Sequence, residues 1–172
     1  MTEKVDQLNN QAIQLANKGD YKEAIACFKR AITIDQTNHL VWYNLGVTYR
    51  DAGKLSDAQA ALKQATKLAP DNEDVMETYA TVCLLKKDYE MAFNFCQSCL
   101  KDNPQWYNMW NIIGVIAFQN NKFDMAADYF EISLSVFPYN LDTLYNLRDT
   151  YEKLENEKGK QDCQNRINEL EK

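Results

Sequence analysis

Apolar residues along this chain recur at two periods, one short and one long. Over short stretches they fall at helical spacing, as in Trp42, Leu45, Tyr49 and Ala52, because residues three or four positions apart share one face of a helix. This pattern breaks at four places, residues 18–20, 52–54, 87–88 and 120–122. The sequence therefore predicts a series of short amphipathic helices joined by brief turns.

The long period is set out by the prolines. The only prolines in the chain, Pro70, Pro104 and Pro138, are 34 residues apart, and Gln36 lies 34 residues before Pro70. Small residues share this spacing at Ala24, Ala58, Ala92 and Ala126, and again at Ala12, Gly46, Ala80 and Gly114. Large residues run beside them at Leu8, Trp42, Met76, Trp110 and Leu144, and at Phe28, Leu62, Cys96 and Phe130. Glycine inside a helix costs about 1 kcal/mol relative to alanine, so the two glycines indicate close helix crossings. Each unit is expected to hold two helices, the second ending at a proline.

These residues carry a family resemblance. Trp42, Leu45, Gly46 and Tyr49, followed by Ala58 and Pro70, resemble the tetratricopeptide repeat, a helix-turn-helix unit of about 34 residues. The resemblance implies an all-α fold, a right-handed superhelical solenoid of antiparallel helix pairs forming one domain over residues 1–172. The expected repeats span residues 5–38, 39–72, 73–106 and 107–140, and a degenerate fifth, capping pair spans 141–172. The sequence departs from the pattern at Gln36, in place of proline, and at Lys87 and Asn121, in place of the turn glycine.

Both ends of the array have their own signals. We call positions that lie one repeat length apart a column. Gln7 and Gln14 stand in columns that hold mostly apolar residues in the later units, so the first unit is expected to have no unit before it. Cys163, Ile167 and Leu170 form a thin apolar stripe within residues 161–172, which predicts an amphipathic capping helix. A complete solenoid is the resulting expectation. Ser56 with Gln59 predicts a capping box at one helix start.

Charge and composition narrow the function classes. A net charge of −6 argues against nucleic acid as a partner, because phosphate binding needs clustered lysine and arginine. The longest apolar run, residues 112–118, is far short of the roughly 20 residues that cross a bilayer, so direct membrane insertion is not expected. Residues 1–6 lack an apolar stretch of signal-peptide type. The five cysteines are an odd number and do not indicate a disulfide framework. The expected location is cytoplasmic.

Candidate catalytic chemistry is sparse. The single histidine, His39, has no nucleophile or second ligand near it in sequence, and the acidic residues cluster in turns, where solvated charge explains them. Cys83, Cys96 and Cys99 fall in core columns, which favours small buried hydrophobes over a redox or soft-metal cluster. The sequence therefore predicts no catalytic residue, no metal site and no cofactor, and the chain is not expected to be an enzyme.

The remaining candidate is a groove. In the family that this sequence resembles, the first helix of each unit lines a concave surface that binds an extended peptide or a partner's helix. Asn10, Asn44 and Asn146 share one column, and an asparagine amide suits a peptide backbone because it both donates and accepts hydrogen bonds. Carried over by column, the lining residues are Asn9, Asn10, Ile13, Tyr43, Asn44, Val47, Arg50, Glu77, Thr78, Thr81, Asn111, Ile112, Val115, Phe118, Tyr145 and Asn146.

One known kind of ligand is disfavoured. Family members that hold acidic chaperone C-terminal tails use lysine, arginine and asparagine on three consecutive first helices. The corresponding residues here are Asn9, Ile13, Asn44, Asp74 and Thr78 in the first three units, and Tyr43, Val47, Thr78, Asn108 and Ile112 in the next three. Neither set has the cations that such a clamp requires.

The first interpretation is therefore a non-catalytic protein–protein interaction module or adaptor that binds a peptide segment or helix of a partner in its groove. One alternative is a secretion or translocator-type chaperone for an aggregation-prone client. Another is a structural subunit of a larger assembly, with Trp106 and Tyr107 as an exposed aromatic contact. A groove or an end face also allows self-association. The sequence does not identify the partner.

Overall fold

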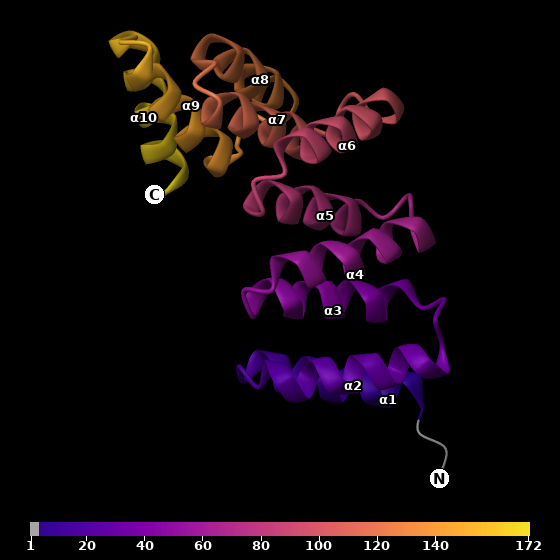
Figure 1. The fold of residues 1–172 in the computed structure, drawn as a ribbon. Helices are drawn as coiled ribbons and strands as arrows, with labels where there is room; N and C mark the ends of the chain where they lie inside the picture. Colours follow the sequence, from indigo (N-terminus) through magenta and orange to yellow (C-terminus); the bar gives the residue numbers. More distant parts are fainter. Residues whose placement is uncertain (1–3) are drawn as a thin grey trace. The chain divides into compact units, whose positions relative to one another are not determined.

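The computed structural model describes residues 4–172; the first three residues, on which the expected absence of a leader partly depends, lie outside this range. Ten helices and no strand are found within it (Figure 1). The helices are α1 (Val5–Asn17), α2 (Tyr21–Ile34), α3 (His39–Asp51), α4 (Leu55–Leu68), α5 (Glu73–Leu85), α6 (Tyr89–Asp102), α7 (Tyr107–Gln119), α8 (Phe123–Val136), α9 (Leu141–Lys153) and α10 (Glu157–Leu170). Helices of 13 and 14 residues alternate throughout, so the helix-pair pattern read from the sequence is confirmed.

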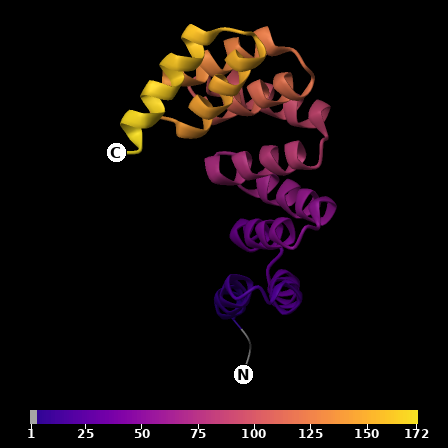
Figure 2. The ribbon, with the colours of Figure 1, turned by 90° about the vertical axis from the view of Figure 1, so that its left-hand side faces the viewer.

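The chain divides into two compact units, Met1–Lys87 and Asp88–Lys172. In the first, α1 packs on α2 and α3 on α4, while α3 also contacts α2 and α5 contacts α4. Figure 2 views α1 and α2, in indigo, nearly along their axes as a side-by-side pair. In the second unit, α7 packs on α6 and α8, and α9 packs on α8 and α10. Each unit is thus a stack in which a helix contacts its chain neighbours.

The turns inside the pairs share one backbone conformation. Gly19 and Gly53 have φ of 85° and 73°, in the left-handed region that favours glycine. Lys87, Asn121 and Glu155 occupy the same column in the later units and also have positive φ, of 62°, 58° and 55°. The turn is therefore retained at all three positions where another residue replaces glycine, and the register is undisturbed.

Close approaches of two helices explain Gly46 in α3 and Gly114 in α7. A Cβ on Gly46 would lie 2.5 Å from Cγ of Leu62, and one on Gly114 would lie 2.5 Å from Cε1 of Phe130. Leu62 and Phe130 are fully buried, so the small and large columns meet as the sequence predicts. Each contact joins the two helices of one pair, α3 to α4 and α7 to α8.

Side-chain caps occur at the first helices of several pairs. The Asn38 carboxamide oxygen accepts from the backbone N–H groups of Leu40 and Val41, and Asn72 and Asn140 cap α5 and α9. The predicted Ser56–Gln59 capping box is wrong, because α4 begins at Leu55 and has no side-chain cap. Gln59 is instead buried, and its carboxamide oxygen accepts from Nζ of Lys86 at 2.7 Å.

The last helix closes an apolar core in the second unit. Cys163 and Ile167 are buried with Leu144 and Leu147, and Leu170 stays partly exposed at the end of the stripe. The predicted amphipathic helix is therefore present as α10, although it begins before residue 161, and its capping role stays a prediction. Across residues 4–172, no helix has both the length and the apolar character that a bilayer crossing requires.

Candidate functional site

The predicted groove residues lie on the first helices of the pairs and fall into two sets, one in each unit. In the first unit they come from α1, α3 and α5, and α3 contacts both of the others. In the second unit they come from α7 and α9, which also contact each other. Each set is described separately below, because each unit is compact by itself.

In the first unit, the predicted residues are half-buried except Asn10, which is exposed. The Asn44 amide nitrogen donates to the carboxamide oxygen of Asn9 at 3.0 Å, which links α3 to α1. Between α5 and α3, the Thr78 hydroxyl donates to the Tyr43 hydroxyl at 3.5 Å. Polar side chains of neighbouring first helices therefore bind each other across the surface.

The remaining first-unit residues set the character of this surface. Ile13, Val47 and Thr81 follow one column of half-buried, mostly apolar side chains. Arg50 forms an ion pair with Asp51, with N and O atoms 2.8 Å apart, so its charge is compensated within α3. Glu77, also half-buried, contributes the carboxylate of this set.

The second unit repeats the same asparagine bond. The Asn146 amide nitrogen of α9 donates to the carboxamide oxygen of Asn111 of α7 at 3.1 Å. Both asparagine pairs join residues 35 positions apart, one position more than the repeat. The sequence placed Asn10, Asn44 and Asn146 in a single ladder, whereas the observed bonds connect two adjacent columns. Comparison of single columns along the sequence did not predict these bonds between asparagines of adjacent columns.

A small pocket lies beside this second pair. It has a volume of about 110 Å³, and Val115, Phe118 and Asn146 are among its lining residues, together with Gln119, Phe130 and Asp149. The Phe118 ring packs edge-on against Phe123, with ring centroids 5.2 Å apart, which fixes one wall. Gln119 and Asp149 were not among the predicted groove residues.

Two predicted residues of the second unit are less available than the sequence suggested. Ile112 is only 7% exposed, so it belongs to the core rather than to an open surface. The Tyr145 hydroxyl donates to the Glu171 carboxylate, and this hydrogen bond raises the pKa of Tyr145 above its usual value. Arg148 lies over the Tyr145 ring, with its guanidinium carbon 4.9 Å from the ring centroid. Tyr145 is therefore held against the chain's own end.

Side chains that bind metal ions do not cluster within residues 4–172. No set of three or more histidine, cysteine, aspartate or glutamate side chains there is arranged to hold a metal ion. All five cysteines are free and buried, and burial raises the pKa of Cys99 to about 11. Trp106, predicted as an exposed contact, is only 9% exposed, because it lies at the start of α7 against the core. The exposed aromatic side chains of this unit are Phe137 and Tyr139.

Stacked helix pairs, with the first helices of neighbouring pairs in contact within each unit, define a helical-repeat protein. A family model described as the cytochrome c-type biogenesis protein H TPR domain matches residues 31–143, and the tetratricopeptide repeat model matches residues 5–38. The chain belongs to the tetratricopeptide repeat family, as its sequence suggested.

Several known proteins are similar to this chain. The cytochrome c-type biogenesis protein CycH of Pseudomonas aeruginosa is 24% identical over 120 residues, which cover 68% of this chain and 30% of that protein. The STIP1 homolog of Dictyostelium discoideum is 32% identical over 69 residues, covering 40% of this chain and 12% of that protein. The chain thus spans less than a third of these curated relatives.

Two solved structures share the fold. MamA from Desulfovibrio magneticus RS-1, residues 41 to the end, superposes with a TM-score of 0.80 at 16% identity, covering 99% of this chain and 97% of that one. YrrB, described as a TPR protein with an unusual peptide-binding site, has a TM-score of 0.67 at 19% identity and covers 95% of this chain and 84% of that one. At these identities the likeness concerns the fold.

Proposed function

We propose that the chain is a non-catalytic interaction module that binds a segment of another protein along the first helices of its repeats. The paired asparagines carry this proposal. Each Asn–Asn bond uses one N–H of one amide and the oxygen of the other, and within residues 4–172 these amides make no other side-chain bond. Each pair therefore retains N–H groups and acceptor capacity at half-buried positions, which suits a peptide backbone whatever its side chains.

The rest of the surface fits a ligand of mixed apolar and neutral character. Ile13, Val47 and Val115 offer apolar contact, and the Arg50 charge is compensated by Asp51. An acidic tail would find no cluster of free cations among these residues. The fold that the chain shares with YrrB, whose description mentions a peptide-binding site, agrees with a peptide ligand.

Photo-crosslinking from the surface tests this proposal. A photoreactive residue at the exposed position 10 should capture a partner in cells, whereas one at the exposed Lys63 on α4 should capture far less. Asn44→Ala combined with Asn146→Ala should reduce the capture severalfold without loss of helicity. Asn94→Ala, on the exposed surface of α6, is the matched control. Undiminished capture by the double variant would rule out the asparagine pairs as the binding groups.

The compartment belongs to the same proposal. Five free cysteines, all buried, are compatible with a reducing environment, and we place the chain in the cytoplasm. A labelled chain should then co-fractionate with cytoplasmic markers, and recovery with another compartment would contradict this placement.

A second candidate function follows from the family match. The model that covers residues 31–143 is that of a cytochrome c-type biogenesis protein, and the matched relative CycH has the same description. An assembly role in cytochrome c maturation would make the ligand a segment of another maturation protein or of an apocytochrome. Deletion of the gene should then lower the content of covalently bound haem in c-type cytochromes, and an unchanged content would exclude this role.

A further inference from the structure

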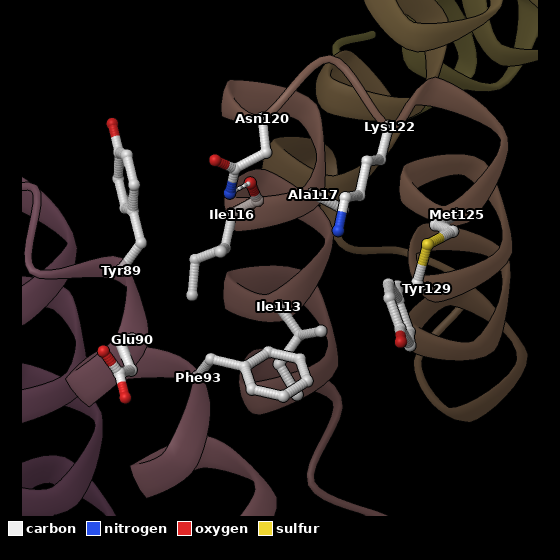
Figure 3. Close-up of a pocket in the computed structure, with 10 residues that line it drawn as sticks. All are labelled: Tyr89, Glu90, Phe93, Ile113, Ile116, Ala117, Asn120, Lys122, Met125 and Tyr129. Atoms are coloured by element: carbon white, nitrogen blue, oxygen red, sulfur yellow. Dashed lines mark hydrogen bonds between the residues drawn. The ribbon is translucent and has the colours of Figure 1, made fainter.

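Pockets occur on two sides of α7. On the outer side, residues of α6, α7 and α8 line a pocket of about 360 Å³, with Phe93, Ile113 and Met125 among them (Figure 3). Equivalent positions around α3 and α9 line pockets of about 500 and 330 Å³. Pockets on this side therefore recur with the repeat and do not set one helix pair apart.

The small pocket on the other side of α7 adjoins the proposed binding surface. We call it the groove pocket; it has a volume of about 110 Å³ and is lined by Val115, Phe118, Gln119, Phe130, Asn146 and Asp149. These residues come from α7, α8 and α9. Because Asn146 also forms the hydrogen bond to Asn111, a peptide backbone held by this asparagine pair would lie beside the pocket.

The interior of the groove pocket is apolar and rigid. The Phe130 ring reaches it because Gly114 has no side chain, and a Cβ on Gly114 would lie 2.5 Å from this ring. Phe130 is 1% exposed, so it forms the floor. Phe118 is held edge-on against Phe123, and Val115 is half-buried beside it. The walls are thus fixed by contacts that the chain makes without a ligand.

The polar groups lie at the mouth of the pocket. Gln119 and Asp149 are exposed, and Asn146 is half-buried. Nε and Nη2 of Arg148 donate to one carboxylate oxygen of Asp149 at 3.0 and 2.8 Å, so this negative charge is compensated by its neighbour. A mouth of amide groups and a compensated carboxylate suits the backbone of a peptide better than a charged side chain.

The volume limits the side chain that can enter. An apolar cavity of about 150 Å³ holds benzene. With the same space for each atom, a pocket of about 110 Å³ takes about four carbon atoms, the size of a leucine or isoleucine side chain. A phenylalanine side chain is larger than this, and an alanine methyl group leaves most of the space empty.

The same columns have different chemistry in the first unit. Arg50 and Asp51 stand there in the columns of Phe118 and Gln119. Their side chains form an ion pair with N and O atoms 2.8 Å apart, so a charged wall replaces the aromatic one. A preference for an aliphatic side chain therefore belongs to the second unit.

We propose that the groove pocket selects a leucine or isoleucine side chain of the bound segment, while the Asn111–Asn146 pair holds the backbone beside it. This selection rests on the proposed function and adds to it the side chain by which the ligand is recognised. Burial of the aliphatic group against Phe118 and Phe130 supplies the affinity, and the amides at the mouth orient the backbone.

Capped single amino acids test the pocket, because each presents one side chain between two amide groups. N-acetyl-leucine N-methylamide should shift the methyl NMR signals of Val115 saturably. It should bind about tenfold more tightly than the alanine compound, because it buries more apolar surface. The phenylalanine and lysine compounds should bind more weakly than the leucine compound. Shifts that do not saturate with leucine, or equal affinities for leucine and alanine, would overturn the proposal.

Two variants change the size of the pocket in opposite directions. Val115→Phe should fill it and weaken leucine binding about tenfold, whereas Val47→Phe, the same change in the same column of the first unit, should have no effect. Phe118→Ala should enlarge the pocket, so that the phenylalanine compound binds at least as tightly as the leucine compound. This second variant keeps the test decisive if Val115→Phe does not fold. An unchanged preference for leucine in folded Phe118→Ala would overturn the assignment.

Crosslinking from position 10 tests the proposed function separately, because this position lies in the first unit. Capture of a partner without any preference for leucine in the probe titrations would overturn the groove pocket and leave the proposed function intact. A preference for leucine without capture would count against the proposed function and support the pocket as a site for an aliphatic side chain.

Discussion

Replacing Gly114 by alanine separates two opposing effects on stability. Alanine favours a helix over glycine by about 1 kcal/mol, so propensity alone predicts a more stable protein. The structure predicts the reverse, because the new Cβ would lie 2.5 Å from Cε1 and 2.6 Å from Cδ1 of Phe130. Ordinary carbon contacts lie near 3.5–4.0 Å, so the ring or the helix must move by about 1 Å.

Phe130 has little freedom to move. It is 1% exposed and packs in a cluster with Ala126, Leu134 and Leu144. Forcing an extra methyl group into such a core costs typically about 1–3 kcal/mol. After the gain in propensity, the free energy of unfolding should fall by about 0–2 kcal/mol. Most of the strain should appear between α7 and α8.

Urea denaturation followed by circular dichroism measures this difference. Ala60→Gly, at an exposed position of α4, gives the propensity term in the same chain and should cost about 1 kcal/mol. Ala12 and Phe28, both fully buried, are the counterparts of Gly114 and Phe130 in the first pair, so alanine is tolerated where the two helices are spaced for it. A Gly114→Ala protein more stable than wild type by the full propensity term would refute the close approach.

Three further outcomes are expected. Asn140→Ala should lower the free energy of unfolding by about 1 kcal/mol, because the Asn140 side-chain oxygen accepts from the backbone N–H of Thr143 at 2.8 Å. Asn140→Ser should restore most of this stability. An equal loss in both variants would exclude the cap. Deletion of residues 159–172 should expose the buried Leu144 and lower both solubility and the melting temperature, and an unchanged melting temperature would argue against a capping helix. Burial raises the pKa of Cys99 to about 11 in the folded chain from an ordinary value of 9.0, so the folded state binds this proton more tightly. The free energy of unfolding should therefore fall as the pH rises from about 9 to about 11, and a slope that Cys99→Ala leaves unchanged would contradict this assignment.

The sequence was sufficient to predict the helix pairs because the constraints that form them are local and repeat at a fixed spacing. Prolines two residues beyond α4, α6 and α8, together with the small and large columns, set the register. Even the turns at Lys87 and Asn121, which lack glycine, keep the left-handed backbone. Comparison of equivalent positions therefore predicts a contact wherever the same type of residue packs against the same neighbour in each repeat.

Details of the surface were harder to predict, because they depend on how neighbouring helices are offset. The asparagine bonds join positions 35 residues apart, so they connect columns that an alignment of the repeats keeps separate. Ile112 is buried although Asn44 and Asn146, in its column, are half-exposed. Gln59 looked like a capping residue in sequence but is buried, where it accepts a hydrogen bond from Lys86.

The column of Ala117 shows how a repeat can vary its surface without losing its fold. Truncating a buried tyrosine to alanine usually costs several kcal/mol, because the cavity that it leaves does not collapse fully. Ala117 stands where two other units have Tyr49 and Tyr151. The ring comes instead from Tyr129 on α8, which stands in the column of the small residues Ala61 and Cys163. The core columns therefore hold the helices together while a neighbouring column is free to change. The helix that supplies the ring can therefore differ between units, because a large residue on one helix of the pair is matched by a small residue on the other, and the fold is kept.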